Sequence, residues 1–485
     1  MTPALRRLAL LALGLCPAAA LASDFPYPLG VTPALERFYH TGQAVAVLPE
    51  GGYAAVWEAA DGSNSDVRMQ WIRPDGTRVF PEGGVLVASS KDWEYNAVVI
   101  PHPRSGVFVA FVRDEVKHGP GNSRIYAQWY DGSGRRRWPG QAVAVAPVSI
   151  QESQFLPQLL PDGRDGLFAC FIRNRPFTDG NDPYSEIGCQ RLDAGGRRLW
   201  TNRGRLAGGT AGFRGGPLAV TDGRGGLLVF WLNLRTPLTP PHEHQLLEGQ
   251  RFSPAGERLW GDTGRVIHRM DRIEEAGFRI PPFRAVPDGK GGAVLAFDDR
   301  LERGLQQQTD VVAQRVDRDG RPLWGEGTRV AAGPGHQFVN DLAAAPGGGA
   351  FVSVLGFRSG ATEVLLSRLD GDGSILWGDV PAESEEPGLE VSSYLHFQPS
   401  LETLIVLWEH HVGLDPQRSE ARLATFDLDG HRLSWGSMTD QASWTRPRGI
   451  AYDDRINLGL AVWETTYEGG DENTAGALFG ISAKD

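Results

Sequence analysis

Aromatic and charged side chains recur together along the chain, in short groups separated by apolar, strand-like stretches. A guanidinium group binds carboxylates and phosphates through paired hydrogen bonds, and aromatic rings attract cations and pack against flat ligands. We expect these groups to bind an anionic or sugar-like ligand, although packing within the fold would also explain the aromatic residues. The residues expected at this ligand site are Arg37, Tyr39, His40, Trp93, Tyr95, Arg214, Arg279, Asp341, His396, Trp444 and Arg448.

Catalysis at the same place would need a close pair of carboxylates, or a histidine or tyrosine base with a shifted pKa. The recurring groups contain few acids, and the candidates are Glu36, Glu94 and Asp341. The sequence has neither a G-x-S-x-G elbow nor an H-E-x-x-H helix. A binding protein is therefore a better hypothesis than an enzyme.

The sequence gives only weak evidence for a metal site, because few residues stand at the spacing of metal ligands. Residues 242–244 (His-Glu-His) and 410–411 (His-His) are predicted loop histidines without a third ligand at metal spacing. D-x-D-G turns lack the downstream glutamate of a calcium loop, and a tight hairpin alone would explain their Asp and Gly. These turns are residues 317–320, 370–373 and 427–430. We expect no metal and no cofactor.

The composition favours an all-β protein with many tight turns, since 62 of the 485 residues are glycine and 33 are proline. The hydrophobic fraction of 41% is that of a folded protein and not of a disordered one. The net charge of −11 argues against a nucleic-acid partner held by a basic surface.

The N-terminal residues have the pattern of a secretion signal. A basic pair (Arg6-Arg7) precedes apolar residues 8–15, and residues 20–22 (Ala-Leu-Ala) form a cleavage site. We expect residues 1–22 to be a signal peptide and residues 23–485 to form one exported domain, periplasmic or secreted. No later stretch is long and apolar enough to be a transmembrane segment. Lipidation is a minor alternative, because a lipobox needs a small residue before its cysteine.

One pattern repeats through the chain after the signal peptide. An apolar strand ends in an aromatic residue, a strand similar to VVAQRVD follows, and a tryptophan stands four residues after the glycine of a D-x-x-G turn. The clearest copy spans residues 287–300 and 310–327. The first marker, the end of the apolar strand, occurs eight times and is aromatic except at Val354, at Trp57, Phe111, Phe171, Trp231, Phe297, Val354, Trp408 and Trp463. The second marker, the aromatic residue after the D-x-x-G turn, occurs seven times, at Phe80, Trp138, Trp200, Trp260, Trp324, Trp377 and Trp435.

The repeat predicts an all-β fold, an eight-bladed β-propeller of four-stranded antiparallel blades. The last copy lacks its final strand, and residues 25–31 resemble that strand. We therefore expect the N-terminal strand to close the ring, which an open solenoid, the alternative, would not need. Cys170 and Cys189 fall on neighbouring strands of one blade. We expect a disulfide between them, and two buried free thiols are the alternative.

The strand AQRVD followed by D-x-x-G-x-x-L-W-G resembles the repeats of secreted bacterial β-propeller proteins, and more distantly quinoprotein-like and WD40-like repeats. Glycine and tryptophan four residues apart carry this resemblance, as in Gly196–Trp200 and Gly320–Trp324. The resemblance implies a scaffold rather than an activity. Quinone-dependent enzymes of that fold carry adjacent cysteines beside the cofactor, and this sequence has none.

Residues 278–281 (Phe-Arg-Ile-Pro) resemble the motif with which sialidases hold a substrate carboxylate, and Asp298 and Asp299 follow. The preceding repeat has Phe213-Arg214 at the corresponding place, so the Phe-Arg pair is a feature of the repeat. Sialidase Asp-boxes also place tryptophan three residues after glycine, not four. Sialidase-like chemistry is therefore a minor alternative.

Loop length predicts the functional face. Short turns join the first strand to the second and the third to the fourth, and they lie on one face of a propeller. Longer connections lie on the opposite face, where binding sites usually form. They include residues 113–124, 174–185, 233–246, 299–309 and 409–420. We expect the ligand at the channel mouth on that face, with Arg214, Arg279 and Arg448 as the anion contacts.

We therefore predict an exported, monomeric β-propeller that acts as a binding or scaffold module for an envelope or extracellular protein or glycan. The alternative is a polysaccharide hydrolase or lyase that uses the same face. A purely structural role in a surface layer is a third possibility. No nucleic-acid partner is expected.

Overall fold

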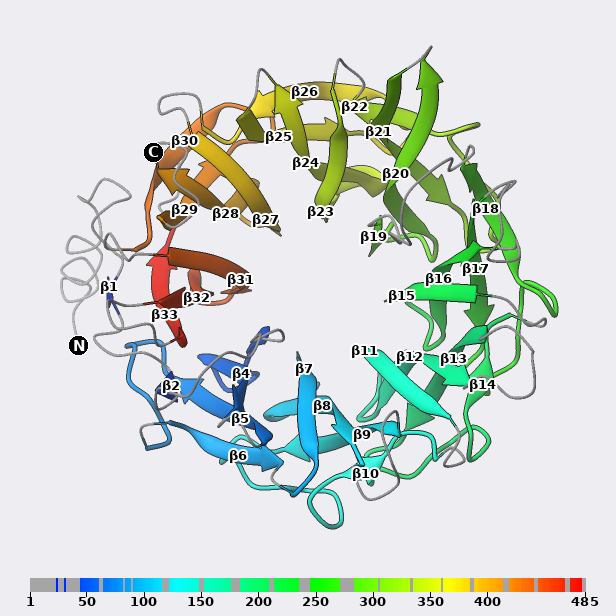
Figure 1. The fold of residues 1–485 in the computed structure, drawn as a ribbon, viewed down its shortest axis with the longest axis vertical. Coiled ribbons are helices and arrows are strands. Elements are labelled where there is room, and N and C mark those ends of the chain that lie inside the picture. Colours follow the sequence, from blue (N-terminus) through cyan, green and yellow to red (C-terminus); the bar gives the residue numbers. More distant parts are fainter. Residues whose placement is uncertain are drawn as a thin grey trace, which may run out of the picture.

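Eight antiparallel sheets stand side by side in a closed ring around a central axis (Figure 1), which confirms the predicted propeller. We call the middle of the ring, along this axis, the channel. Seven sheets have four strands, and the eighth is completed from the N-terminus. The structure, a computed structural model, describes residues 23–24, 30–31, 44–60, 64–81, 83–88, 90–115, 122–147, 152–175, 184–208, 213–234, 245–270, 283–303, 306–331, 335–358, 361–383, 388–412, 418–439, 444–466 and 472–481.

Each blade begins with the strand nearest the channel and proceeds outward. The innermost strands are β3 (Ala44–Val47), β7 (Trp93–Pro101), β11 (Ser153–Pro161), β15 (Phe213–Thr221), β19 (Phe283–Pro287), β23 (Gln337–Ala345), β27 (Gly388–Gln398) and β31 (Trp444–Asp453). The second strands are β4 (Tyr53–Ala60), β8 (Val107–Asp114), β12 (Leu167–Arg175), β16 (Leu227–Leu234), β20 (Ala293–Arg303), β24 (Gly349–Arg358), β28 (Thr403–Val412) and β32 (Leu458–Thr466).

The outer half of each blade is formed by the third and fourth strands. The third strands are β5 (Ser65–Ile72), β9 (Ser123–Tyr130), β13 (Tyr184–Leu192), β17 (Gln245–Phe252), β21 (Gln306–Val316), β25 (Ala361–Leu369), β29 (Ser419–Phe426) and β33 (Glu472–Gly480). The fourth strands are β6 (Val85–Ala88), β10 (Val143–Ala144), β14 (Arg205–Leu206), β18 (Arg265–Met270), β22 (Thr328–Ala331), β26 (Ile375–Pro381) and β30 (Arg432–Ser437). A 3-10 turn (Pro346–Gly348) joins β23 to β24. Within the described ranges we find no helix with the length and apolar character needed to cross a membrane.

The N-terminus closes the ring, as predicted, but with two short strands instead of one. Both β1 (Ser23–Asp24) and β2 (Gly30–Val31) pair antiparallel with β33 and occupy the outer edge of the eighth blade. The eighth and first blades also share a buried cluster, in which Tyr53 packs with Leu460 and Leu478. Covering the free edge of β33 removes a surface on which another chain could pair.

The repeated tryptophans dock each blade onto the next. The indole nitrogen of Trp200 donates a hydrogen bond to the carbonyl of Pro254, 3.1 Å away in the following blade. The ring also covers Gly256, where a Cβ atom would lie 2.8 Å from it and where φ is +83°. Glycine is therefore required at this place by both backbone and packing. The same pairing of tryptophan and glycine recurs in Trp138–Gly196, Trp260–Gly320, Trp324–Gly373 and Trp377–Gly430.

The conserved spacing of glutamine and arginine in the repeat has a structural cause. Gln190, fully buried, accepts hydrogen bonds from the backbone N–H groups of Arg191 and Trp200. Arg191 forms a buried ion pair of 2.8 Å with Asp162, the aspartate of the turn between the first two strands. The equivalent pairs are Arg251–Asp222 and Arg315–Asp288. These residues stabilise the scaffold.

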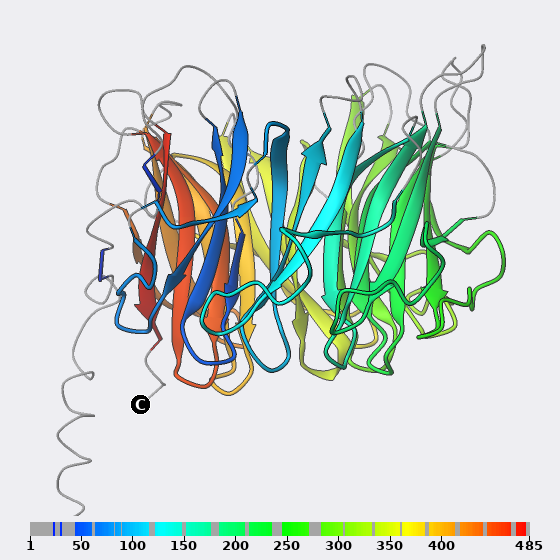
Figure 2. The ribbon, with the colours of Figure 1, turned by 90° about the horizontal axis from the view of Figure 1, so that it is seen from below.

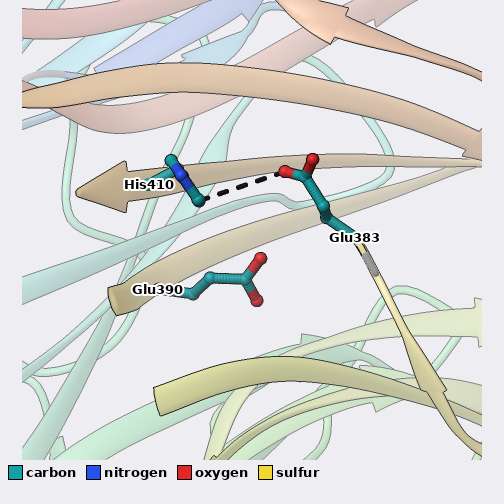
Figure 3. A group of neighbouring side chains, drawn as sticks. All are labelled: Glu383, Glu390 and His410. Carbon is teal, nitrogen blue, oxygen red and sulfur yellow. Dashed lines mark ion pairs between the residues drawn. The ribbon is translucent and has the colours of Figure 1, made fainter. Parts of the chain in front are cut away.

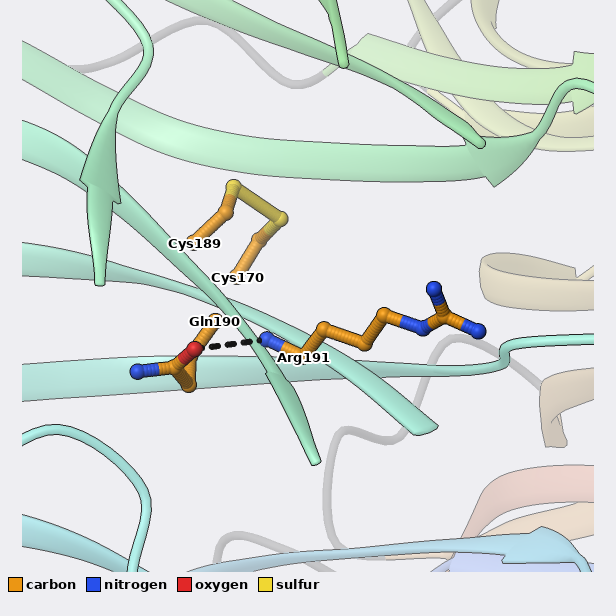
Figure 4. The surroundings of a disulfide bond; sticks show 4 residues. All are labelled: Cys170, Cys189, Gln190 and Arg191. Atoms are coloured by element: carbon orange, nitrogen blue, oxygen red, sulfur yellow. Dashed lines mark hydrogen bonds between the residues drawn. A yellow bond between two sulfur atoms is a disulfide. The ribbon is translucent and has the colours of Figure 1, made fainter. Parts of the chain in front are cut away.

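Cys170 and Cys189 form the predicted disulfide (Figure 4). The two residues face each other directly on β12 and β13, with Cα atoms 4.1 Å apart. Both side chains are buried in the cluster between the third and fourth blades, beside Trp200 and Trp231. The disulfide therefore joins neighbouring strands within one blade at an interface between two blades.

The two faces of the ring differ as predicted, but several strands are longer than expected. The turns between first and second and between third and fourth strands lie on one face, the lower edge in Figure 2, here called the turn face. We call the opposite face the crossing face. The predicted loop 299–309 is wrong, because β20 and β21 continue through most of it. The polar residues in this segment do not end the two strands, because residues of β20 pair with residues of β21 as far as Arg303 and Gln306.

Candidate ligand-binding site in the channel

One position of the repeat recurs at the same place on the innermost strand of every blade, the strand nearest the channel. This position is defined by cross-strand pairing. On each innermost strand, it is the residue whose partner on the second strand immediately precedes the repeat marker at the end of that second strand. We call these eight residues the channel ring. In blade order they are Ala44, Val98, Gln158, Leu218, Arg284, Asp341, Tyr394 and Gly449. All eight are only partly buried.

The channel ring has an apolar arc and a polar arc. Three of its four members in the first four blades are apolar, whereas blades five to seven contribute Arg284, Asp341 and Tyr394. The eighth blade has glycine at this position, and Arg448 precedes it in a β-bulge between Pro447 and Gly449. A bulge turns a side chain away from the regular alternation of the strand. We call Arg284, Asp341, Tyr394, Arg446 and Arg448 the channel cluster.

Arg284 and Asp341 interact across two neighbouring blades. The guanidinium Nε lies 3.7 Å from one carboxylate oxygen, and the side chains keep 39% and 24% of their exposure. The other oxygen accepts a hydrogen bond of 2.8 Å from the backbone N–H of Leu395 in the seventh blade. Burial raises the pKa of Asp341, while Arg284 and the backbone hydrogen bonds lower it in part. Asp341 therefore holds Arg284 in position and links three blades.

Tyr394 lies among the charges of the cluster. Burial raises the pKa of its hydroxyl, with Arg448, Arg446 and Arg284 opposing that rise and Asp341 adding to it. A tyrosine with a raised pKa keeps its proton at neutral pH and can donate a hydrogen bond. Its ring packs on the buried cluster between the seventh and eighth blades.

Two further arginines come from the innermost strand of the eighth blade. Arg448 forms an ion pair of 2.5 Å with Glu464 of the same blade and is 15% exposed. Arg446 is exposed and forms no ion pair with any residue that the structure describes. Three guanidinium groups thus lie near the carboxyl groups of Asp341 and Glu464, and Glu58 of the first blade interacts electrostatically with Arg448.

The predicted site residues are distributed over several places. Asp341 and Arg448 belong to the channel cluster, and Trp444 begins the same strand as Arg448. Arg214 is buried, 3% exposed, with its guanidinium against Gly208 in the interior between blades. Trp93 and Tyr95 lie on β7, where the Tyr95 hydroxyl is 3.2 Å from Ser123 Oγ. Arg37, Tyr39, His40 and Arg279 lie outside the described residues.

His396 lies near the turn face and not near the crossing face as expected. It pairs with Ile405 close to the turn that joins β27 to β28, and its Nε2 is 3.7 Å from Asp454 in the next blade. Burial lowers the pKa of this imidazole, and Asp454 raises it in part. Sequence analysis missed Arg284 entirely, because it considered the connections between blades and not the strands that follow them.

A second group of polar residues is enclosed between the sixth and seventh blades. Figure 3 shows Glu383, Glu390 and His410 directed toward one another. Arg422 forms an ion pair with Glu383, whose carboxylate is 3.9 Å from His410 Nδ1. Glu390 accepts a hydrogen bond from the backbone N–H of Val364. Placing His410 in a loop was wrong, because β28 continues through it to Val412.

The protonation of Glu390 decides what this buried group can do. Burial, together with the nearby carboxylates of Glu383 and Glu363, raises the pKa of Glu390 to about 8, while Arg422 lowers it in part. Glu390 therefore carries a proton at neutral pH. The ligand atoms of Glu383, Glu390 and His410 lie within 4.8 Å of one another, close enough to share a metal ion. A cation would have to displace both this proton and Arg422, so the group fits a contact between blades better than a metal centre.

The residues of two other candidate motifs form hydrogen bonds within the protein. Asp427, Asp429 and His431 could also reach one cation. However, Asp427 Oδ1 already accepts the backbone N–H groups of Asp429 and His431, both at 2.9 Å, as a hairpin aspartate does. Asp298 accepts the backbone N–H of Val339, and Asp299 lies 3.0 Å from His268. The motif at 278–281 and the histidines at 242–244 lie outside the described residues.

The sequence matches no known family model and no curated protein. Among solved structures, it is similar to a puromycin hydrolase at 16% identity and a TM-score of 0.49, covering 92% of this chain and 61% of that one. The polysaccharide lyase Uly1 is 12% identical with a TM-score of 0.48, covering 85% of this chain and 95% of that one. A puromycin-hydrolyzing peptidase of Mycobacterium tuberculosis is 11% identical with a TM-score of 0.46, covering 92% and 62%. The chain thus spans about three fifths of the two puromycin-hydrolysing proteins, and none of these similarities bears on its activity.

Proposed function

We propose that this protein is an exported binding module that takes a carboxylate-bearing glycan into its channel, on the polar arc. The observation that carries the proposal is the arrangement of Arg284, Asp341 and Tyr394 at the same position of three innermost strands, with Arg446 beside them. Only a closed ring brings these residues together, since they come from four successive blades.

The chemistry of the channel cluster suits binding of a carboxylate. Arg284 and Arg446 offer guanidinium groups that remain at least partly exposed, and such groups bind carboxylates through two parallel hydrogen bonds. Tyr394 carries a proton that it can donate to a sugar hydroxyl or ring oxygen. Asp341 accepts hydrogen bonds and prevents the two neighbouring arginines from repelling each other.

The alternative of a polysaccharide hydrolase or lyase fits the cluster less well. A lyase needs a base, and the raised pKa of Tyr394 opposes its deprotonation. A hydrolase needs two accessible carboxyl groups, whereas Asp341 is the one acid of this cluster outside the Arg448–Glu464 pair. Glu383 and Glu390 are two neighbouring carboxyl groups, as a hydrolase uses, but both side chains are enclosed between blades.

Export and the kind of partner are also part of the proposal. The buried disulfide between Cys170 and Cys189 is typical of proteins that fold outside the cytoplasm. An envelope or extracellular glycan would meet the protein there, and a monomer would suffice because one ring contains the whole cluster. The likeness to quinoprotein-like repeats remains a prediction about the scaffold alone.

Isothermal titration calorimetry with a galacturonic acid trimer tests the proposal, with a neutral glucose trimer as the control ligand. We expect the acidic trimer to bind the wild type, and R284Q/R446Q to weaken that binding at least about tenfold, the effect of losing charge-assisted hydrogen bonds. R135Q/R321Q, which removes two exposed arginines from turns outside the channel, is the matched control and should bind as the wild type does. Equal binding of both trimers, or of R284Q/R446Q and wild type, would contradict the proposal.

A further inference from the structure

The turns around the channel on the turn face carry a basic residue in four successive blades. The third residue of the turn between first and second strands is Arg104, Arg164, Arg224 or Lys290 in blades two to five, and each is exposed. Chain reversal alone would explain turns of this kind, and it does not require a basic residue. The charge of this face is therefore unexpected in an acidic protein.

The backbone of these turns fixes where the basic side chains begin. Asp162 Oδ1 accepts the N–H groups of Arg164 at 2.9 Å and Gly166 at 3.0 Å. Asp222 does the same for Arg224 and Gly226, both at 2.8 Å. Each arginine therefore leaves a turn whose shape is held by an aspartate. The two turns belong to adjacent blades.

A cavity of about 510 Å³ lies between these two turns, at the interface of the third and fourth blades. Arg164 lines it from one blade and Arg224 from the other. Arg191, only 6% exposed, also lines the cavity and pairs with Asp162, and Pro254 completes the wall. Figure 4 shows that Arg191 follows Cys189 and Gln190 on β13, so the disulfide braces the strand that carries it. The cavity is thus lined by a residue of a strand that a disulfide joins to its neighbour.

The electrostatics of the cavity favour an anionic ligand. The Arg191 charge is balanced by Asp162, whereas Arg164 and Arg224 form no ion pair with the residues that the structure describes. Two unbalanced positive charges therefore face one cavity from opposite walls. A tetrahedral oxoanion presents acceptor oxygens in several directions and can bind both, whereas a carboxylate offers one planar face.

We propose that this cavity is a second binding site, for a sugar-sized ligand that carries a phosphate or sulfate ester. The volume lies within the range of cavities that hold small molecules, and a single inorganic ion would leave most of it empty. The site is independent of the channel cluster, which lies on other blades and attracts a different anion.

Calorimetric titration with glucose 6-phosphate, glucose 6-sulfate, glucose and inorganic phosphate tests this site and distinguishes the two esters. We expect at least one ester to bind, glucose not to bind, and phosphate alone to bind at least about tenfold more weakly than the ester. R164Q and R224Q should each weaken ester binding about tenfold or more. R135Q/R321Q should leave ester binding unchanged, and circular dichroism would check that every variant is folded.

Ester binding should also persist in R284Q/R446Q, which separates this site from the channel cluster. Absence of ester binding to the wild type would overturn the proposal, as would unchanged binding by R164Q and R224Q. Binding of inorganic phosphate as tight as that of the ester would overturn the sugar-sized ligand. Loss of ester binding in R284Q/R446Q would place the ester in the channel and overturn the second site.

Discussion

The two arcs of the channel ring occupy the same repeat position and yet have different chemistry. Ala44, Val98 and Leu218 represent the apolar arc, and Arg284 and Asp341 represent the polar arc. Both arcs rest on the same scaffold of docking tryptophans and Asp–Gly turns. The scaffold therefore tolerates apolar residues at this position, whereas the charged residues in blades five and six link neighbouring blades.

A second difference separates blades three to five from the interface between blades six and seven. In blades three to five, the aspartate of the turn between the first two strands is paired with an arginine of its own blade, as in Arg191–Asp162 and Arg251–Asp222. Between blades six and seven, Glu390 is buried with other carboxylates nearby and with a raised pKa. Blades three to five thus bury their charges in pairs, whereas the later interface buries a carboxyl group whose ionisation would cost stability.

The scaffold should respond alike in both arcs when a docking tryptophan is removed. Replacing Trp200, which docks the third blade, or Trp324, which docks the fifth, by alanine should cost about 3–5 kcal/mol of unfolding free energy. Both leave a cavity at an interface between blades. Chemical denaturation would measure the loss, and a clear difference between the two variants would contradict a shared scaffold.

The disulfide lies on the apolar side of the ring and should stabilise the folded protein. Replacing Cys170 and Cys189 together by alanine should lower the free energy of unfolding by only about 3 kcal/mol, because a disulfide that closes a short loop restricts the unfolded chain less than one that closes a long loop. In the unreduced wild type, unfolding in denaturant should expose no thiol from this pair to alkylation. Two titratable thiols there would show that the disulfide does not form.

The polar side should respond to pH through Glu390. Its pKa of about 8 in the folded protein lies above its ordinary value near 4.5, so the folded state holds a proton that the unfolded chain releases between these values. The contribution of Glu390 to stability therefore falls as pH rises from about 5 to about 8.

Glu390→Gln should remove this dependence, because glutamine keeps the acceptor for Val364 and cannot ionise. Thermal unfolding at pH 5 should be similar for the variant and the wild type. At pH 9 the variant should be more stable, by on the order of 1–3 kcal/mol. A variant that is less stable than the wild type at pH 9 would show that Glu390 is needed in its ionised form.

The fold was predictable because its signals repeat. The glycine-to-tryptophan spacing predicted the blades, residues 25–31 predicted closure on β33, and Cys170 and Cys189 fell directly opposite each other. Each of these depends on local spacing, which the chain repeats or places on adjacent strands.

The channel ring was missed because the site was sought on the connections before the innermost strands. The repeat marker itself aligns Arg284 with Asp341, since Phe297 and Val354 each follow 13 residues later. β-bulges disturb the count only on the N-terminal side of the ring, where the pairing of Tyr95 and Val98 with β8 skips two residues and that of Val339 and Asp341 with β24 skips one. The attention to the connections also placed His396 at the wrong end of β27.

Hydrogen exchange of the wild type with and without the galacturonic acid trimer tests the central claim most directly, because it locates the ligand on one arc. We predict slower exchange of backbone amides in β19, β23, β27 and β31, and no change in β7, β11 and β15. Slower exchange in β7, β11 and β15, or no slowing along the channel at a trimer concentration that saturates calorimetric binding, would contradict a ligand site on the polar arc.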